Sequence, residues 1–150
     1  MMTLWFDDLE VGMTFDGPPR TVSDADVASF CALSGDFHPL HTDEGYARNS
    51  PFGARLVHGA LVLSIATGMR SKLPFVGEPL MAFAEIRDWV FHLPVFIGDT
   101  LSTRTIIGEL RQTSKPDLGV VVQRVEVRNQ DDALVQSGRM VNLIRRALIT

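Results

Sequence analysis

The sequence predicts an α+β fold in which one antiparallel sheet wraps around a long central helix. Two observations support this prediction. The longest mostly apolar stretch, residues 54–69, has the length of a helix, and the apolar periodicity changes to that of strands after Gly77. A helical first half followed by a second half made only of strands is typical of α+β rather than α/β proteins.

The first half begins with a short expected strand around Met13–Thr21, which Gly17-Pro18-Pro19 interrupts. A helix should start at Ser23, because its hydroxyl can cap backbone donors and two aspartates follow in the first turn. We expect this helix to stop near Gly35. A short helix should then form over Asp43–Arg48, within a turn-rich stretch.

The central helix is expected over Gly59–Leu73. Pro74 lies just past its end, where a proline stops a helix. The helix is apolar on nearly every side, and a helix of that kind is buried all round. We therefore expect it to form the middle of the core.

Four strands should follow the central helix. The third shows the clearest pattern, because apolar and polar residues alternate along it as in a strand with one wet face. A meander of these strands would leave exposed edges, and pairing two edges in a dimer is one way to cover them. The expected bounds are Leu80–Phe91, Thr100–Leu110, Val121–Arg128 and Ala133–Arg145.

Length and charge exclude several classes of protein. The 150 residues are expected to form one domain, 1–150, large enough to bury about two thirds of its unfolded surface. The net charge is −4 and no basic stripe is present, which argues against nucleic-acid binding. Cys31 is the only cysteine, so we expect no internal disulfide and a cytoplasmic location. We also expect neither a signal peptide nor a membrane span.

The run Ser34–His41 carries the strongest sign of chemistry, because it places Asp36 and His41 five residues apart on a turn. Each residue alone has an ordinary explanation, since Gly-Asp is common in turns and a histidine ahead of a helix cap is often half-buried. Together they can share one water or one substrate proton. Histidine titrates near neutral pH, and a carboxylate is tuned by its surroundings.

Val57-His58-Gly59 supplies the second feature. Gly59 stands at the expected start of the central helix, where unpaired N–H groups and the helix dipole suit an oxyanion. Its missing Cβ lets a carbonyl oxygen come close. His58 is expected to hold the helix entry rather than to react. Ser64 and Thr67 lie within about two turns of the helix start, and either can face the site, although most such hydroxyls bond to the preceding turn.

Metal ligands of the right chemical type are also gathered in this region: Asp36, His38, His41 and His58. Their spacing matches no standard metal site, and His38 lies on the opposite side of Pro39 from His41. We therefore predict that the protein has no metal site.

These motifs resemble those of the MaoC-like dehydratases, the family of (R)-specific enoyl-CoA hydratases with a hot-dog fold. Ser34–His41 is similar to the family's hydratase motif, in which an Asp and a His flank an Asn-Pro-hydrophobic stretch. Val57–Gly59 is similar to the start of its hot-dog helix, and Phe91–Asp99 to its third signature, where a strand ends before Pro-Val and Gly-Asp. The chain departs at His38, where the family usually has Asn, while Thr67 stands where well-studied relatives have a serine.

The resemblance implies a mechanism and a substrate class. Asp36 and His41 would be the catalytic residues and hold a water between them, while the N–H of Gly59 would polarise the thioester carbonyl. A trans-2-enoyl thioester of CoA would be hydrated to an (R)-3-hydroxyacyl thioester, and the reverse reaction is a dehydration. No metal or redox cofactor is needed, and the family implies a homodimer. The expected substrate-binding positions, besides Gly59, are His38, His58, Ser64 and Thr67.

Three alternatives remain open at this point. The first is a dehydratase acting on acyl carrier protein, and the second is a hot-dog subunit that binds acyl thioesters without turnover. The intact pair of Asp36 and His41 argues against the second. The third is a hot-dog thioesterase, which would need a carboxylate on the central helix, whereas residues 57–73 contain no Asp or Glu.

Overall fold

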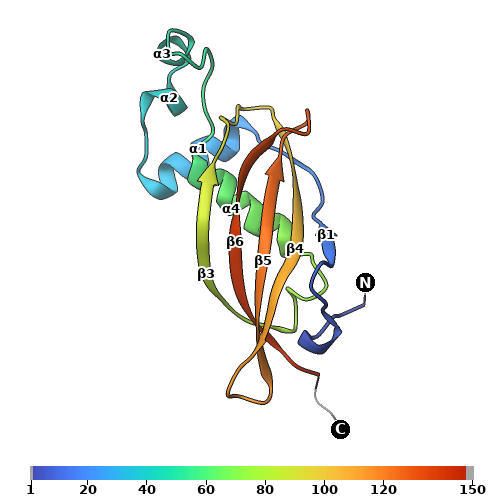
Figure 1. Ribbon diagram of the computed structural model, residues 1–150. Coiled ribbons are helices and arrows are strands. Elements are labelled where there is room, and N and C mark those ends of the chain that lie inside the picture. The colour runs from blue at the N-terminus through green and yellow to red at the C-terminus, as the bar shows by residue number, and fades with distance from the viewer. Residues whose placement is uncertain (1, 148–150) are drawn as a thin grey trace.

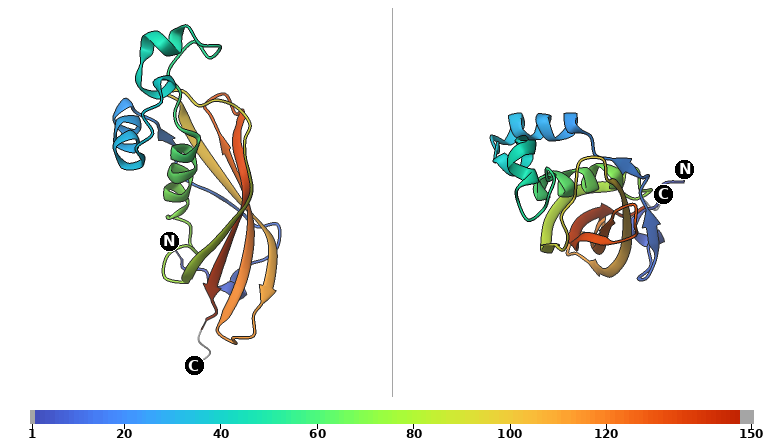
Figure 2. Two further views of the ribbon diagram at one scale, coloured as in Figure 1. Left: turned by 90° about the vertical axis from the view of Figure 1, so that its left-hand side faces the viewer. Right: turned by 90° about the horizontal axis from the view of Figure 1, so that it is seen from above.

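The computed structural model describes residues 2–147 and shows a six-stranded antiparallel sheet curved around the helix α4 (Figure 1). Seen from above, the strands wrap around one side of α4 (Figure 2), which is the predicted α+β architecture. A bilayer crossing would need a longer apolar helix than any that residues 2–147 form. The elements are η1 (Phe6–Asp8), β1 (Thr14–Asp16), β2 (Arg20–Thr21), α1 (Asp24–Ser34), α2 (Pro39–Thr42), α3 (Glu44–Arg48), α4 (Gly59–Arg70), β3 (Leu80–Phe91), β4 (Thr100–Gln112), β5 (Leu118–Arg128) and β6 (Leu134–Arg145).

The strands lie in the order β1-β4-β5-β6-β3, and β2 pairs with β4. The predicted meander is therefore wrong for β3, which pairs with β6 at the far edge and not with β4. The segment between β3 and β4 passes the start of α4, where the Val57 N–H donates to the Val95 carbonyl (2.8 Å). This crossing takes the chain from the edge strand β3 toward the opposite edge of the sheet, where β4 lies next to β1. The strands β5 and β6 then fill the space between β4 and β3, so that β6 pairs with β3.

The helix α4 begins at Gly59, as predicted, but it ends at Arg70 and not at Leu73. The residues that follow form tight turns, in which the Leu73 N–H donates to the Arg70 carbonyl (3.0 Å). Pro74 contributes to this ending, because a proline disfavours helical backbone at the residue before it. The expected burial all round is also wrong. The sheet covers only one side of the helix, and the outer side exposes a stripe of small residues, Ala60, Ser64 and Gly68.

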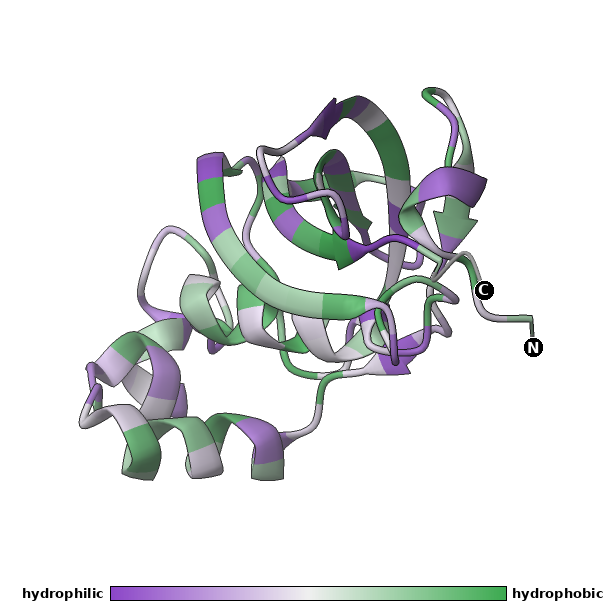
Figure 3. Cartoon of the chain, turned by 90° about the horizontal axis from the view of Figure 1, so that it is seen from below, coloured by the Kyte–Doolittle hydropathy of each residue, from purple (hydrophilic) through white to green (hydrophobic). Residues whose placement is uncertain are grey.

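The inner face of α4 packs against the concave side of the sheet. Val62 and Ile65 are buried there and belong to one cluster with Val127 and Val135. Figure 3 shows the alternation of hydrophobic and hydrophilic residues along the strands that produces this one-sided contact. Burying one such side chain is worth about 1.5–3 kcal/mol. The packing therefore fixes the helix on the sheet, and with it the position of Gly59.

The C-terminal end of α4 buries a cation. Arg70 is 3% exposed, and its guanidinium donates to Thr105 Oγ1 (3.0 Å), Met140 Sδ (2.8 Å) and Gln123 Oε1. None of the ion pairs within residues 2–147 includes Arg70. Burial lowers the pKa of Arg70 to about 10. The helix dipole favours a cation at this end, which offsets part of the cost of burial.

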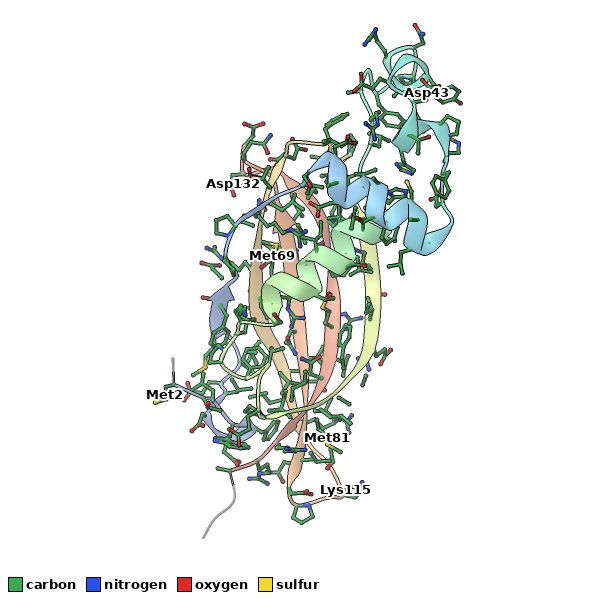
Figure 4. The ribbon with its side chains drawn as sticks, turned by 180° about the vertical axis from the view of Figure 1, so that it is seen from behind. Met2, Asp43, Met69, Met81, Lys115 and Asp132 are labelled. Atoms are coloured by element: carbon green, nitrogen blue, oxygen red, sulfur yellow. The ribbon has the colours of Figure 1, made fainter. Side chains whose placement is uncertain are left out.

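The helices α1, α2 and α3 lie toward one end of the sheet, and α2 and α3 extend beyond it (Figures 2 and 4, where Asp43 marks the extension). The start of α1 is as predicted, because the Asp26 N–H donates to Ser23 Oγ (3.1 Å) and the Ser23 N–H donates to the Asp26 carboxylate (2.9 Å). The helix ends at Gly35, whose φ of 78° lies in the left-handed region that favours glycine. The chain then turns sharply into the motif around Asp36.

The helical turn α2 was not expected from the sequence, whereas α3 matches the prediction. Pro39 fits the first position of α2, since its missing N–H would have no intrahelical partner there. His38 caps the same turn, because its ring Nδ1 accepts from the Leu40 N–H (3.1 Å). Asp43 caps α3 by accepting from the Tyr46 N–H (2.9 Å).

Candidate active site

Asp36 lies in the turn between α1 and α2, His41 lies in α2, and their side chains approach each other. The Asp36 N–H donates to Ser34 Oγ (3.1 Å), and its Oδ1 accepts from the His38 N–H (3.2 Å). Its Oδ2 is 4.0 Å from Nε2 of His41. That separation is too long for a direct hydrogen bond, and one water between the two atoms would join them.

The proton position on His41 follows from its partner. Nδ1 lies 2.7 Å from the Leu56 carbonyl, which can only accept, so Nδ1 carries a proton. In the neutral ring, Nε2 then holds a lone pair directed toward Asp36. Arg55 fixes the main chain of His41, because its Nε–H donates to the His41 carbonyl (2.8 Å). The guanidinium of Arg55 also forms an ion pair with Asp24 on α1 (2.8 Å).

His58 supports this pair from behind. It is 3% exposed, and its Nε2–H donates to the Asp36 carbonyl (3.0 Å). Its ring stacks on the ring of His41, with centroids 3.7 Å apart and an angle of 22° between the planes. Its Nδ1 is buried without a partner among the described residues. These contacts hold Asp36 and His41, whereas the His58 side chain makes no cap hydrogen bond at the start of α4.

A cavity of about 370 Å³ joins His41 to the start of α4, since both His41 and Gly59 line it. The first helical hydrogen bond is donated by Val62 to the His58 carbonyl (3.1 Å), so the amides of the first turn have no intrahelical partner. A Cβ at residue 59 would fall against the ring of Phe91, 2.7 Å from Cδ2 and Cζ. A side chain at this point of the cavity wall would therefore force the Phe91 ring or the helix start to shift.

Three of the four candidate metal-ligating residues noted in the sequence lie close together. One ligand atom from each of Asp36, His41 and His58 lies within 4.8 Å of the other two. His38 is not in this group, since its Nδ1 is used to cap α2. The Nε2 of His58 carries a proton that it donates to the Asp36 carbonyl, so that atom has no lone pair for a metal. The absence of a metal site stays a prediction, because Asp36 and His41 each keep a ligand atom in this group.

Comparison with known proteins places this chain in a family. The family model of the MaoC like domain matches residues 8–130. The chain belongs to the MaoC-like domain family. Among curated relatives, a 3-hydroxybutyryl-CoA dehydratase of Methylorubrum extorquens is 32% identical over 111 residues, 73% of this chain and 68% of the relative. An (R)-specific enoyl-CoA hydratase of Aeromonas caviae is 33% identical over 118 residues, 78% of this chain and 82% of the relative.

The fold of this MaoC-like chain is the hot-dog fold. A solved structure of a conserved Mycobacterium tuberculosis protein, described as having a double hotdog fold, superposes with a TM-score of 0.86. It is 26% identical and matches 99% of this chain and 46% of its own. The predicted sheet around a long central helix is thereby confirmed.

Several positions that the MaoC-like resemblance suggested for substrate binding do not line the cavity at Gly59. The Ser64 hydroxyl donates to the Ala60 carbonyl (2.8 Å) and the Thr67 hydroxyl to the Ser64 carbonyl (2.7 Å). Both therefore bond back to the preceding turn, the ordinary behaviour noted for such residues. His38 caps α2, outside the cavity. Substrate contacts by these residues stay predictions.

Other residues of the MaoC-like cavity could not be identified from the sequence. Phe91, His92 and Gln136 line it. The ring of His92 lies 2.7 Å from the Ser137 hydroxyl, a partner that only the pairing of β3 with β6 reveals. The Pro-Val step of the third signature places Phe91–Val95 at the start of α4, and this motif was the one available signal for that part of the wall.

Proposed function

We propose that this chain is a hydratase/dehydratase that interconverts trans-2-enoyl and (R)-3-hydroxyacyl thioesters of CoA. The observation that carries the proposal is the pair Asp36 Oδ2 and His41 Nε2, 4.0 Å apart, of which His41 also lines the cavity that Gly59 lines at the start of α4, whereas Asp36 is not among the lining residues. The relatives named 3-hydroxybutyryl-CoA dehydratase and (R)-specific enoyl-CoA hydratase support the same chemistry.

In the proposed reaction the helix start binds the thioester. As water adds to C3 of the enoyl group, negative charge develops on the thioester oxygen. The Gly59 N–H and the dipole of the 12-residue helix α4 stabilise that charge more than they stabilise the neutral carbonyl. The missing Cβ of Gly59 lets the ring of Phe91 pack directly against the helix start, where the thioester would bind.

Asp36 and His41 handle the proton. A water that bridges Asp36 Oδ2 and His41 Nε2, 4.0 Å apart, can donate to both atoms where the carboxylate and the imidazole Nε2 are free to accept. One of the two takes the proton while the water oxygen bonds to C3, and a proton is delivered to C2 on the same face. Stacking on His58 and the hydrogen bond to the Leu56 carbonyl hold the imidazole in place during these steps.

Hydration of crotonyl-CoA, followed as the loss of enoyl absorbance, tests this function. Asp36→Asn and His41→Ala should each lower turnover by at least about 100-fold, the size of a general acid–base contribution. Asp117→Asn, in the turn between β4 and β5, is a matched carboxylate control that should leave turnover unchanged. Near-normal rates in both folded site variants would refute the assignment.

The same assay separates the alternatives. An acyl-carrier-protein dehydratase would turn over the carrier-bound enoyl group much faster than crotonyl-CoA. A subunit that only binds thioesters would bind crotonyl-CoA without absorbance change. Extensive chelation should leave activity unchanged, and activity that is lost and then restored by zinc would favour a metal at Asp36 and His41 instead.

We also propose that the chain forms one domain over residues 1–150 and works as a homodimer in a reducing cytoplasm, although residues 1 and 148–150 lie outside the described range. The sheet ends at β3, a long edge strand. An apolar edge of this kind is a template for pairing with a second copy. A monomer mass by light scattering would contradict the dimer. The large apolar side chains of β3 that are at least 40% exposed are Met81, Phe83, Ile86, Val90 and Phe91.

A further inference from the structure

Gln136 on β6 is a buried polar side chain that lines the cavity and has no part in the proton transfer described above. It is 1% exposed. Its Nε2 donates to the Gly59 carbonyl (3.0 Å), and its Oε1 accepts from Nε1–H of Trp89 on β3 (2.9 Å). One amide thus connects the two strands at the edge of the sheet to the first residue of α4.

The orientation of this amide is fixed by its two partners. An indole N–H can only donate and a backbone carbonyl can only accept, so the oxygen of Gln136 must face Trp89 and its nitrogen must face Gly59. Trp89 is held in turn by Gly138, where a Cβ would lie 2.7 Å from Cε3 of the indole. The tryptophan therefore packs directly on the backbone of β6, next to Gln136.

The carbonyl that Gln136 holds belongs to the peptide whose N–H is that of Ala60. Both the Gly59 and the Ala60 N–H are among the first-turn donors without an intrahelical partner. A hydrogen bond to the carbonyl fixes the plane of this peptide and polarises its N–H. Glycine has the most backbone freedom of all residues, so a restraint from outside the helix matters most at this position.

We propose that Gln136 is a positioning residue that holds the Gly59–Ala60 peptide so that the first-turn N–H groups of α4 point at the thioester oxygen. Trp89 acts through it by fixing which way the amide faces. The role of this clamp in catalysis rests on the proposed function. The restraint on the peptide does not, because it concerns only the protein's own groups.

Gln136→Met and Gln136→Glu test the clamp. Methionine removes both hydrogen bonds at similar length, whereas glutamate can still accept from Trp89 but, as a carboxylate, cannot donate to the Gly59 carbonyl. We expect kcat for crotonyl-CoA to fall by about 10- to 100-fold in both variants, because the first-turn N–H groups that stabilise the transition state are no longer held in the required orientation. KM should change by less than about threefold, and in Gln136→Met the pH profile should keep its shape, since Asp36 and His41 are untouched and no titratable group is added.

Gln123→Met is the matched control. Gln123 is also a fully buried glutamine, but it contacts Arg70 at the other end of α4. This variant measures what the loss of a buried amide does to activity through stability alone. A kcat within twofold of the parent in both Gln136 variants would overturn the proposal. A kcat loss that Gln123→Met reproduces at equal loss of thermal stability would overturn it as well.

The amide NMR signals of Gly59 and Ala60 keep this test separate from the proposed function. In Gln136→Met they should shift and exchange faster with solvent, whereas in Gln123→Met they should not. If the parent protein hydrates no enoyl thioester, the proposed function fails while these signals still report the restraint. Unchanged Gly59 and Ala60 signals in a folded Gln136→Met protein would show that the clamp does not exist.

Discussion

The helix dipole places a partial positive charge at the N-terminal end of α4 and a partial negative charge at its C-terminal end. The two partial charges are compensated in different ways. At the N-terminal end the first-turn amides have no intrahelical partner, no side chain caps them, and Gly59 faces the cavity beside His41. At the C-terminal end the chain places the buried guanidinium of Arg70. A dipole favours an anion at the first end and a cation at the second.

The difference lies in where the compensating charge comes from. The cation at the C-terminal end is part of the chain and is always present, so it acts on the stability of the fold. At the N-terminal end the compensating charge is the negative charge that develops on the thioester oxygen during the reaction. This end of the helix therefore stabilises the transition state. Changes at the two ends should therefore separate activity from stability.

The largest expected effect comes from Gly59→Ala at the N-terminal end of α4, called the open end here because no side chain caps it. The new Cβ would collide with the ring of Phe91 and displace either the ring or the helix start. We expect kcat/KM for crotonyl-CoA to fall by about 100-fold, the size seen when one oxyanion donor is lost. Adding Phe91→Ala to this variant should recover part of the loss by making room for the methyl group.

Gly68→Ala is the control on the same helix. Nothing lies within 4 Å of a Cβ at this position, so the substitution should keep activity and raise stability by about 1 kcal/mol through helix propensity. If Gly59→Ala kept full activity, the close approach at the helix start would have no role in the reaction.

At the C-terminal end of α4, Arg70→Ala should reduce the free energy of unfolding by about 3 kcal/mol. The substitution leaves a cavity and removes the hydrogen-bond partner of Thr105 and Gln123. Arg70→Met should cost less, since it fills much of the space and removes a charge whose burial is unfavourable. Urea unfolding measures both. The kcat of either folded variant should equal that of the parent, and a kcat that fell as far as in Gly59→Ala would mean that the two ends are not separable.

The contrast between the two ends was only half visible in the sequence. Gly59 could be predicted because its signals are local, namely the Val57-His58-Gly59 motif and the apolar run that follows it. The burial of Arg70 could not, since an arginine in the last turn of a helix is also the pattern of a solvent-exposed cation at the dipole's negative end. Its partners come from strands 35 to 70 residues later in the chain.

The same division between local and non-local signals explains the other differences. The Asp36–His41 proximity was predictable, because a turn of a few residues fixes it. The place of β3 beside β6 was not, because strand pairing depends on contacts far apart in the chain. Gln136 was missed for that reason, as it lies 77 residues from Gly59. The exposed stripe of α4 was missed because alanine and glycine count as apolar whether buried or not.

The start of α1, unlike that of α4, is a helix N-terminus whose free N–H groups are capped by the chain's own side chains. Ser23 and Asp26 bond reciprocally there, and the hydrogen bond from the Ser23 N–H lowers the pKa of Asp26 below its ordinary value of 3.8. A lowered pKa of an acid stabilises the folded state above 3.8, and this contribution is lost as the pH falls through the lowered value. Asp26→Asn should therefore cost about 1 kcal/mol at pH 7, leave kcat unchanged, and cost progressively less below pH 3.8 in urea titrations. An equal cost at every pH would show that the carboxylate charge does not stabilise this end, and the contrast with the open end of α4 would then rest on geometry alone.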